Sequence, residues 1–156
     1  MTVSLAYGQG HLPVEFPADR TTVIQPTHRP GLTDERSAIL SALESPIGAP
    51  PLREWLRPGA RICILFTDLT RATPNERLIP WLLAHLESLG VQRSQITLLN
   101  QLGTHRPNTQ AELEKMLTPA VVANYRVVNH EPESEEACVQ LGVTRTGVPA
   151  LRSEEH

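Results

Sequence analysis

Residues 61–74 read RICILFTDLTRATP, an apolar run that passes without alternation into a polar loop. An unbroken apolar run of this length predicts a strand covered on both faces, which is typical of a parallel sheet. From Pro74 to Leu89, apolar side chains recur at intervals of three and four residues, so we expect a helix there that Gly90 ends. Pro80 lies inside this helix and is expected to kink it, because its ring removes one backbone donor.

The same order of strand, loop and helix recurs further along the chain. A second buried strand is expected over Gln95–Asn100, and a second helix over Gln110–Leu117, which Pro119 ends. A third apolar piece lies at 125–128. Strands and helices that alternate with short connections predict an α/β fold, a three-layer Rossmann-like domain with a mainly parallel sheet.

The amino-terminal part is expected to begin with a β-hairpin. Apolar residues alternate over 3–7 and again over 12–16, with glycines between the two segments. A short β-like piece follows at 22–24. Thr33 is then expected to cap a helix that Pro46 ends.

Composition excludes several classes of function. A chain of 156 residues with 40% hydrophobic residues is long enough for one domain with its own core. A net charge of -3 argues against a nucleic-acid partner, and the lack of a long apolar run argues against a membrane partner. Two cysteines, Cys63 and Cys138, make no disulfide framework, and no export signal is visible. We therefore expect reduced thiols and a cytoplasmic protein.

A polar loop and a threonine capping box follow each of the first two strands. Thr73 and Glu76 form the first expected box, with Pro74 at the first helical position, and Thr109 and Glu112 form the second. Both loops then lie at the carboxyl ends of parallel strands, where open α/β sheets bind their ligands. The two loops are therefore expected to face one crevice.

Four side chains in these loops are candidates for a site: Asp68, Arg71, His105 and Arg106. A guanidinium can hold a carboxylate through two parallel hydrogen bonds, and an imidazole can take or give a proton near neutral pH. This chemistry suits a small anionic substrate and general acid–base catalysis. The spacing equally allows a structural interpretation, in which Asp68 forms a local turn and Arg71 and His105 are ordinary surface residues. His105 and His130 lack the paired spacing of metal ligands, so no metal site is expected within the chain.

The motifs in their order resemble the amino-terminal domain of the lactate racemase family, from about Gly8 to Ala150. The resemblance is carried by four stretches: Ser45-Pro46-Ile47-Gly48, Thr67-Asp68-Leu69-Thr70-Arg71-Ala72-Thr73-Pro74, Gly103-Thr104-His105-Arg106-Pro107-Asn108-Thr109 and Val128-Asn129-His130. The Asp-x-Thr-Arg and Gly-Thr-His-Arg-Pro elements together are quite specific. Either element alone would be weak.

The resemblance implies a reaction that inverts the hydroxyl-bearing carbon of a small 2-hydroxy acid, by hydride transfer to and from a nickel-pincer nucleotide. It implies that His105 exchanges the hydroxyl proton and that Arg71 orients the substrate. Arg106 falls in the same motif and is assigned to substrate binding. Asp68 and Thr70 are assigned to the cofactor side of the site.

In the family, the second catalytic histidine, the lysine bonded to the cofactor and the histidine that binds nickel all occur later in the sequence. Residues 1–150 are therefore expected to be an incomplete amino-terminal domain, inactive by itself. Residues 151–156 are expected to be a non-native tail, because 152–156 match the translated start of a common sequencing adapter. Two other functions stay open: a stand-alone α/β module that binds a small carboxylate or phosphate, and a purely structural domain. The oligomeric state is open as well.

Overall fold

The computed structural model describes residues 1–131, 134 and 138–153. The chain forms two compact units, Met1–Thr33 and Asp34–His156, which are described separately. In the first unit, β1 (Thr2–Tyr7) pairs antiparallel with β2 (Gly10–Glu15) across a turn in which Gly8 adopts a φ of 56°. The expected hairpin is thus confirmed. The expected β-like piece at 22–24 is wrong, because these residues have no partner strand and form irregular backbone.

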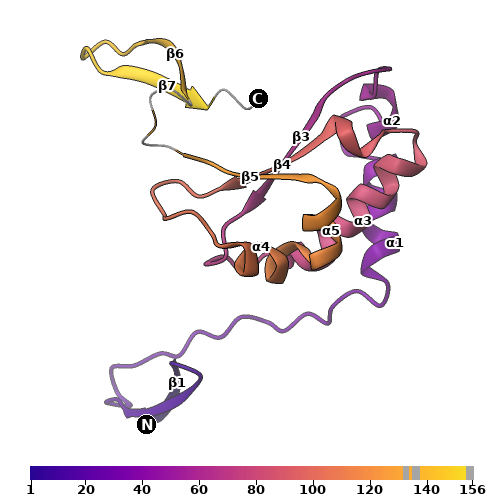
Figure 1. Cartoon of the computed structure of the whole chain (residues 1–156). Helices are drawn as coiled ribbons and strands as arrows, with labels where there is room; N and C mark the ends of the chain where they lie inside the picture. Colours follow the sequence, from indigo (N-terminus) through magenta and orange to yellow (C-terminus); the bar gives the residue numbers. More distant parts are fainter. Residues whose placement is uncertain (132–133, 135–137, 154–156) are drawn as a thin grey trace. The chain divides into compact units, whose positions relative to one another are not determined.

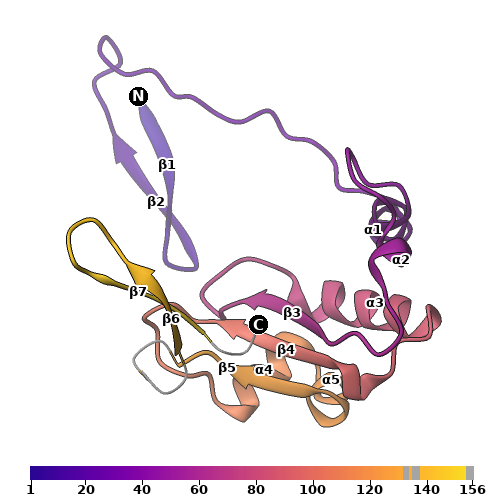
Figure 2. The same ribbon diagram turned by 90° about the horizontal axis from the view of Figure 1, so that it is seen from above.

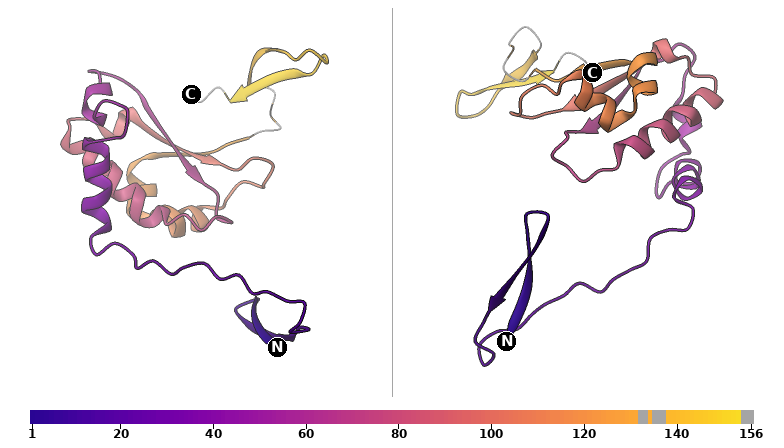
Figure 3. Two further views of the ribbon diagram at one scale, coloured as in Figure 1. Left: turned by 180° about the vertical axis from the view of Figure 1, so that it is seen from behind. Right: turned by 60° about the horizontal axis from the view of Figure 1, so that its bottom comes forward.

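The second unit contains the remaining helices and strands (Figure 1). Its elements are α1 (Glu35–Glu44), α2 (Leu52–Trp55), β3 (Ile62–Thr67), α3 (Asn75–Ser88), a 3₁₀ turn (Arg93–Gln95), β4 (Ile96–Gln101), α4 (Gln110–Leu117), α5 (Pro119–Asn124), β5 (Arg126–Asn129), β6 (Cys138–Val143) and β7 (Pro149–Ser153). Helix α3 runs through Pro80 as one element. Helix α1 packs against α3 (Figure 3), and an ion pair between Glu35 and Arg77 joins the two.

The central sheet has the order β3-β4-β5 and is parallel throughout, and Figure 2 shows its strands side by side. This confirms the α/β class and the parallel sheet. The order advances in one direction, so right-handed crossovers place α3, α4 and α5 on the same face. On the other face of β3, Cys63 and Leu65 are exposed. The described core is therefore a sheet with one helical layer.

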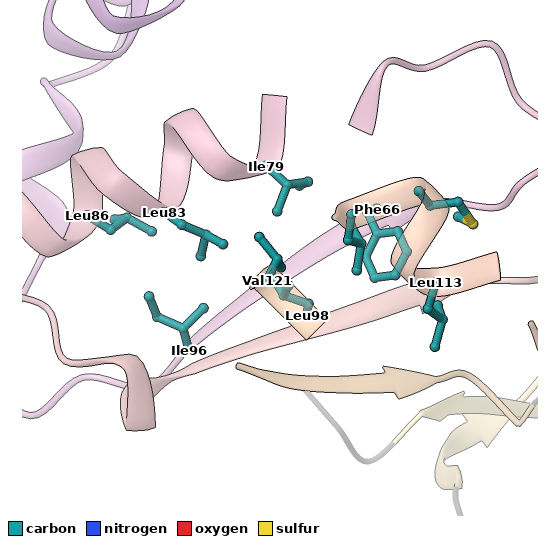
Figure 4. Packing of buried hydrophobic residues seen from close by; sticks show 10 residues of the cluster. Phe66, Ile79, Leu83, Leu86, Ile96, Leu98, Leu113 and Val121 are labelled. Atoms are coloured by element: carbon teal, nitrogen blue, oxygen red, sulfur yellow. The ribbon is translucent and has the colours of Figure 1, made fainter. Parts of the chain in front are cut away.

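The core lies between this sheet and its helices (Figure 4). Phe66 of β3 and Leu98 of β4 pack with Leu83 of α3 and Leu117 of α4, and each of these side chains is at most 2% exposed. Full burial of one such side chain contributes roughly 1.5–3 kcal/mol to folding. The same packing holds the carboxyl ends of β3 and β4 next to each other.

The helix starts show which capping predictions hold. Thr109 and Glu112 form the expected reciprocal box at α4. The box expected from Thr73 and Glu76 is wrong, because α3 begins one residue later, at Asn75, with Pro74 as its N-cap and no side-chain cap. The Thr73 carbonyl instead accepts the Asn75 backbone N–H at 2.8 Å in a tight turn.

At α1 the cap is Asp34 rather than Thr33, since the Asp34 carboxylate accepts the Ser37 N–H at 2.9 Å. An additional helix, α5, was not expected, because Pro119 opens α5 as well as closing α4. The β6–β7 hairpin was also missed.

Strand β7 includes residues 151–153, whereas 154–156 lie outside the described residues, so the expected non-native tail stays a prediction. No helix in the described part of the chain is long and apolar enough to cross a membrane.

Candidate active site at the ends of two parallel strands

Two loops meet at the carboxyl edge of the sheet, one after β3 and one after β4. Strands β3 and β4 are neighbours in register, with Thr67 opposite Gln101, so the residues that follow them leave the sheet side by side. The His105 imidazole meets the Asp68 carboxylate across the two loops, with 2.7 Å between Nδ1 and Oδ2. The expected common crevice therefore brings together two residues that are 37 positions apart.

Asp68 is buried, and one oxygen of its carboxylate accepts several hydrogen bonds. Its Oδ2 accepts hydrogen bonds from the Thr70 hydroxyl at 2.8 Å and the Thr70 N–H at 3.3 Å, in addition to the contact with His105. Burial by itself would raise the pKa of Asp68, but the hydrogen bonds from His105 and Thr70 outweigh it and hold the pKa well below its usual range. Asp68 is therefore ionised near neutral pH. It forms a local turn and also contacts the histidine, so both interpretations of this residue apply.

The ionised carboxylate determines which nitrogen of His105 carries the proton. A carboxylate can only accept, so Nδ1 of the neutral imidazole must donate its hydrogen to Asp68. The lone pair then lies on Nε2, at the other end of the ring. The His105 side chain is 45% exposed, whereas that of Asp68 is 5% exposed. This arrangement gives a solvent-accessible base supported by a buried anion.

The two arginines of the loops differ in their surroundings. Arg71 is exposed, and among the residues that the structure describes its guanidinium has no hydrogen-bond or ion-pair partner. Arg106, by contrast, forms a two-pronged ion pair with Glu112, at 2.9 and 2.7 Å. The hydrogen bonds from Arg106 and from the Thr109 N–H lower the pKa of Glu112 to about 2. Arg71 is thus free for a ligand, whereas a ligand of Arg106 would compete with Glu112.

Two pockets share Asp68 and Leu69 as lining residues. One, of about 300 Å³, is lined also by Thr70, His105, Arg106 and Asn108. The other, of about 190 Å³, contains both Arg71 and Lys115. Cations in one pocket and a histidine base in the next, on either side of a shared carboxylate, suit a small organic acid.

Sequence reasoning gave no role to three asparagines behind the histidine loop, Asn100, Asn108 and Asn129, although the last two lie in the quoted motifs. Their side chains form a hydrogen-bonded cluster at the ends of β4 and β5. One signal was available, since Asn100 lies on the face of its strand that is otherwise formed by the apolar residues Ile96 and Leu98. In the described ranges, no group of three or more histidine, cysteine or acidic side chains is arranged to hold a metal ion.

Comparison with known proteins shows which family the chain resembles. The sequence model described as the lactate racemase N-terminal domain matches residues 7–152. No curated protein sequence matches the chain. Among solved structures, the lactate racemase apoprotein from Thermoanaerobacterium thermosaccharolyticum is similar with a TM-score of 0.82 and 23% sequence identity. The match covers 99% of this chain and 36% of the other, so this chain spans about a third of that protein's length.

Proposed function

Because the chain belongs to the family of lactate racemase N-terminal domains, we propose that it contributes the substrate side of a 2-hydroxyacid racemase or epimerase site. The observation that carries the proposal is the Asp68–His105 pair, which leaves a base on Nε2 of His105. The guanidinium of Arg71, which has no hydrogen-bond or ion-pair partner among the described residues, lines the neighbouring pocket. A base and a carboxylate receptor are the two groups that such a substrate needs from the protein.

In the proposed reaction, Arg71 holds the substrate carboxylate through paired hydrogen bonds. His105 Nε2 takes the proton of the 2-hydroxyl as hydride leaves the carbon, for which the bound cofactor would be the acceptor. His105 returns the proton to the oxygen when the C–H bond forms again. Asp68 accepts the Nδ1 hydrogen throughout and stabilises the transient imidazolium. Arg106 holds the loop through Glu112 and lines the same pocket as His105, so its contact with the substrate is a secondary one.

The residues present fit the anionic part of a nickel-pincer nucleotide. With Arg71 assigned to the substrate carboxylate, Lys115 is the cation that remains in this pocket beside Asp68, whose carboxylate accepts from the Thr70 hydroxyl. This would place the nucleotide near Asp68 and Thr70. When bound, the group would supply reversible hydride acceptance at the substrate carbon. As the family resemblance implies, the histidine that binds nickel and the lysine bonded to the cofactor would come from residues other than the described ones.

The proposal is tested with two proteins: the 156-residue chain and the product of the complete reading frame that encodes it. Both are loaded with cofactor and assayed for interconversion of the two enantiomers of lactate and other 2-hydroxy acids. We expect turnover from the complete product, none from the 156-residue chain, and loss of turnover in His105→Ala. His11→Ala, at an exposed histidine of the first unit, is the matched control and should keep full activity. Full activity of His105→Ala would refute the proposal.

The second candidate is a module that binds a small carboxylate or phosphate without catalysis. Arg71 and Lys115 line one pocket, and the Arg71 guanidinium has no partner among the described residues. This favours the module, because an anion could be held there by this chain alone. Calorimetry of the 156-residue chain with lactate and with inorganic phosphate separates the two functions. Tight binding that Arg71→Ala abolishes, with no turnover by the complete product, would favour the module. The proposed partner is a small acid. That the protein has no nucleic-acid or membrane partner and that it is cytoplasmic stay predictions.

A further inference from the structure

Three asparagine side chains fasten the loop that carries His105. Asn100 donates from Nδ2 to Oδ1 of Asn108 at 2.7 Å and to Oδ1 of Asn129 at 3.0 Å. Asn129 also holds the backbone of Asn108: its Nδ2 donates to the Asn108 carbonyl at 2.9 Å, and its Oδ1 accepts the Asn108 N–H at 3.3 Å. Asn108 is thus held through both its side chain and its main chain.

These bonds close the loop upon itself. The chain leaves β4 with the Leu102 N–H bonded to the Asn100 carbonyl at 3.0 Å, and it returns to Asn108, which is bonded to the Asn100 side chain. Both ends of the loop therefore meet at one residue. His105 lies in the middle, and its own N–H donates to the Leu102 carbonyl at 3.1 Å. Because both ends of the loop are held, the backbone of His105 is fixed in position, and its imidazole can meet Asp68 in one defined geometry.

Folding alone does not account for an amide at position 100. Strand alternation puts Asn100 on the same face as Ile96 and Leu98, which belong to the apolar core. Asn100 is completely buried, and its Oδ1 has no hydrogen-bond partner among the described residues. An unsatisfied buried acceptor is unfavourable, and such departures from good packing concentrate where a protein needs them for function.

We propose that Asn100, Asn108 and Asn129 are positioning residues for His105. By fixing the loop, they preset the hydrogen bond from Nδ1 to Asp68, and hence the lone pair on Nε2. The consequence for catalysis rests on the proposed function of His105. The consequence for the imidazole tautomer does not, so the two can be measured separately.

The first test is nuclear magnetic resonance of the 156-residue chain with ¹⁵N-labelled histidine, at a pH where His105 is neutral. In the unsubstituted chain, long-range ¹H–¹⁵N correlations should show the hydrogen of His105 on Nδ1. In Asn129→Ala, which removes all three bonds of that side chain, we expect a mixture with the Nε2–H tautomer. Asn124→Ala is the matched control, because among the described residues the Asn124 amide bonds to Arg93 and Ala120 and not to the asparagine cluster. An unchanged His105 spectrum in folded Asn129→Ala would overturn the inference.

Should Asn129→Ala fail to fold, Asn108→Ala replaces it, since that change removes a single side-chain bond at the same cluster. A tautomer mixture supports the inference, and an unchanged tautomer overturns it. In the loaded product of the complete reading frame, kcat of the same variant should fall by about 10- to 100-fold, as expected for a misplaced catalytic group, with KM and cofactor content unchanged. An inactive unsubstituted enzyme would refute the proposed function and leave the tautomer result standing. An active enzyme whose variant keeps its full kcat would refute the positioning role alone.

Discussion

Replacing Asp68 by asparagine should remove a pH-dependent part of the stability of this domain. The substitution keeps the volume of a side chain that is 5% exposed, but it removes the charge that accepts from His105 and Thr70. Hydrogen bonds to a charged group contribute roughly 1.5–3 kcal/mol, so we expect the free energy of unfolding near neutral pH to fall by about 2 kcal/mol. Urea denaturation followed by circular dichroism measures this difference.

The sign of the pH dependence follows from the pKa of Asp68, which lies well below its ordinary value of 3.8 in the folded protein. As pH falls below that value, the unfolded chain binds a proton at Asp68 before the folded chain does. The stabilisation is therefore fully present at higher pH and is lost on acidification, at up to about 1.36 kcal/mol per pH unit. The difference in free energy of unfolding between the unsubstituted chain and Asp68→Asn should therefore become smaller as the pH falls. Asp19→Asn, at an exposed aspartate, should show no such gap. A gap that is equal at about pH 7 and about pH 3 would contradict the assigned charge of Asp68.

Three further substitutions test the surroundings of the site. Thr109→Ala should lower the free energy of unfolding by about 1 kcal/mol, because it removes the cap of α4. Thr73→Ala, at a residue that caps no helix in the structure, should change the free energy of unfolding by no more than about 0.5 kcal/mol. An equal effect of the two substitutions would indicate that Thr73 does cap α3. Leu117→Ala should lower the free energy of unfolding by about 2–5 kcal/mol, measured by urea denaturation, because this side chain is 0% exposed in the core. A smaller decrease would mean that the core between the sheet and its helices tolerates a cavity. Arg106→Ala should raise the pKa of Glu112 from about 2 toward its ordinary 4.5, measured by ¹³C resonance titration, and an unmoved pKa would show that Thr109 alone lowers it.

The regular part of the fold could be predicted because its signals are local. Residues 62–66 form an uninterrupted apolar run, and the helix after it repeats its leucines at helical spacing, so strand and helix can be recognised without any partner. Helix α5 and the β6–β7 hairpin escaped prediction for different reasons. Pro119 serves as a stop for one helix and a start for the next, which spacing cannot distinguish. In the hairpin, apolar and polar residues do not alternate regularly, and a bulge between Gln140 and Gly142 interrupts the pairing, so the period-two pattern of a strand is lost.

Only those features of the candidate site that follow from the order of strands and helices could be predicted. Adjacent parallel strands bring their following loops together, so the meeting of Asp68 and His105 follows from the order of elements. The order of elements does not predict which of Arg71 and Arg106 has the free guanidinium, because this depends on a contact between Arg106 and Glu112 on the next helix. The asparagine cluster was missed for the same reason, since its members come from β4, β5 and the loop between β4 and α4.

The Gly-Thr-His-Arg-Pro element therefore combines two tasks in adjacent residues. His105 faces Asp68 on the neighbouring loop, while Arg106 turns to Glu112, whose carboxylate also accepts the Thr109 N–H at the start of α4. The helix cap and the loop are thereby linked through one carboxylate. If Arg106 bound substrate directly and strongly, it would have to release Glu112 and loosen the loop that carries the base. Arg71 can bind an anion at no such cost, since its guanidinium has no hydrogen-bond or ion-pair partner among the described residues. For this reason Arg71→Ala should weaken binding of a 2-hydroxy acid more than Arg106→Ala does, and calorimetry that ranked the two in the opposite order would refute this division of roles.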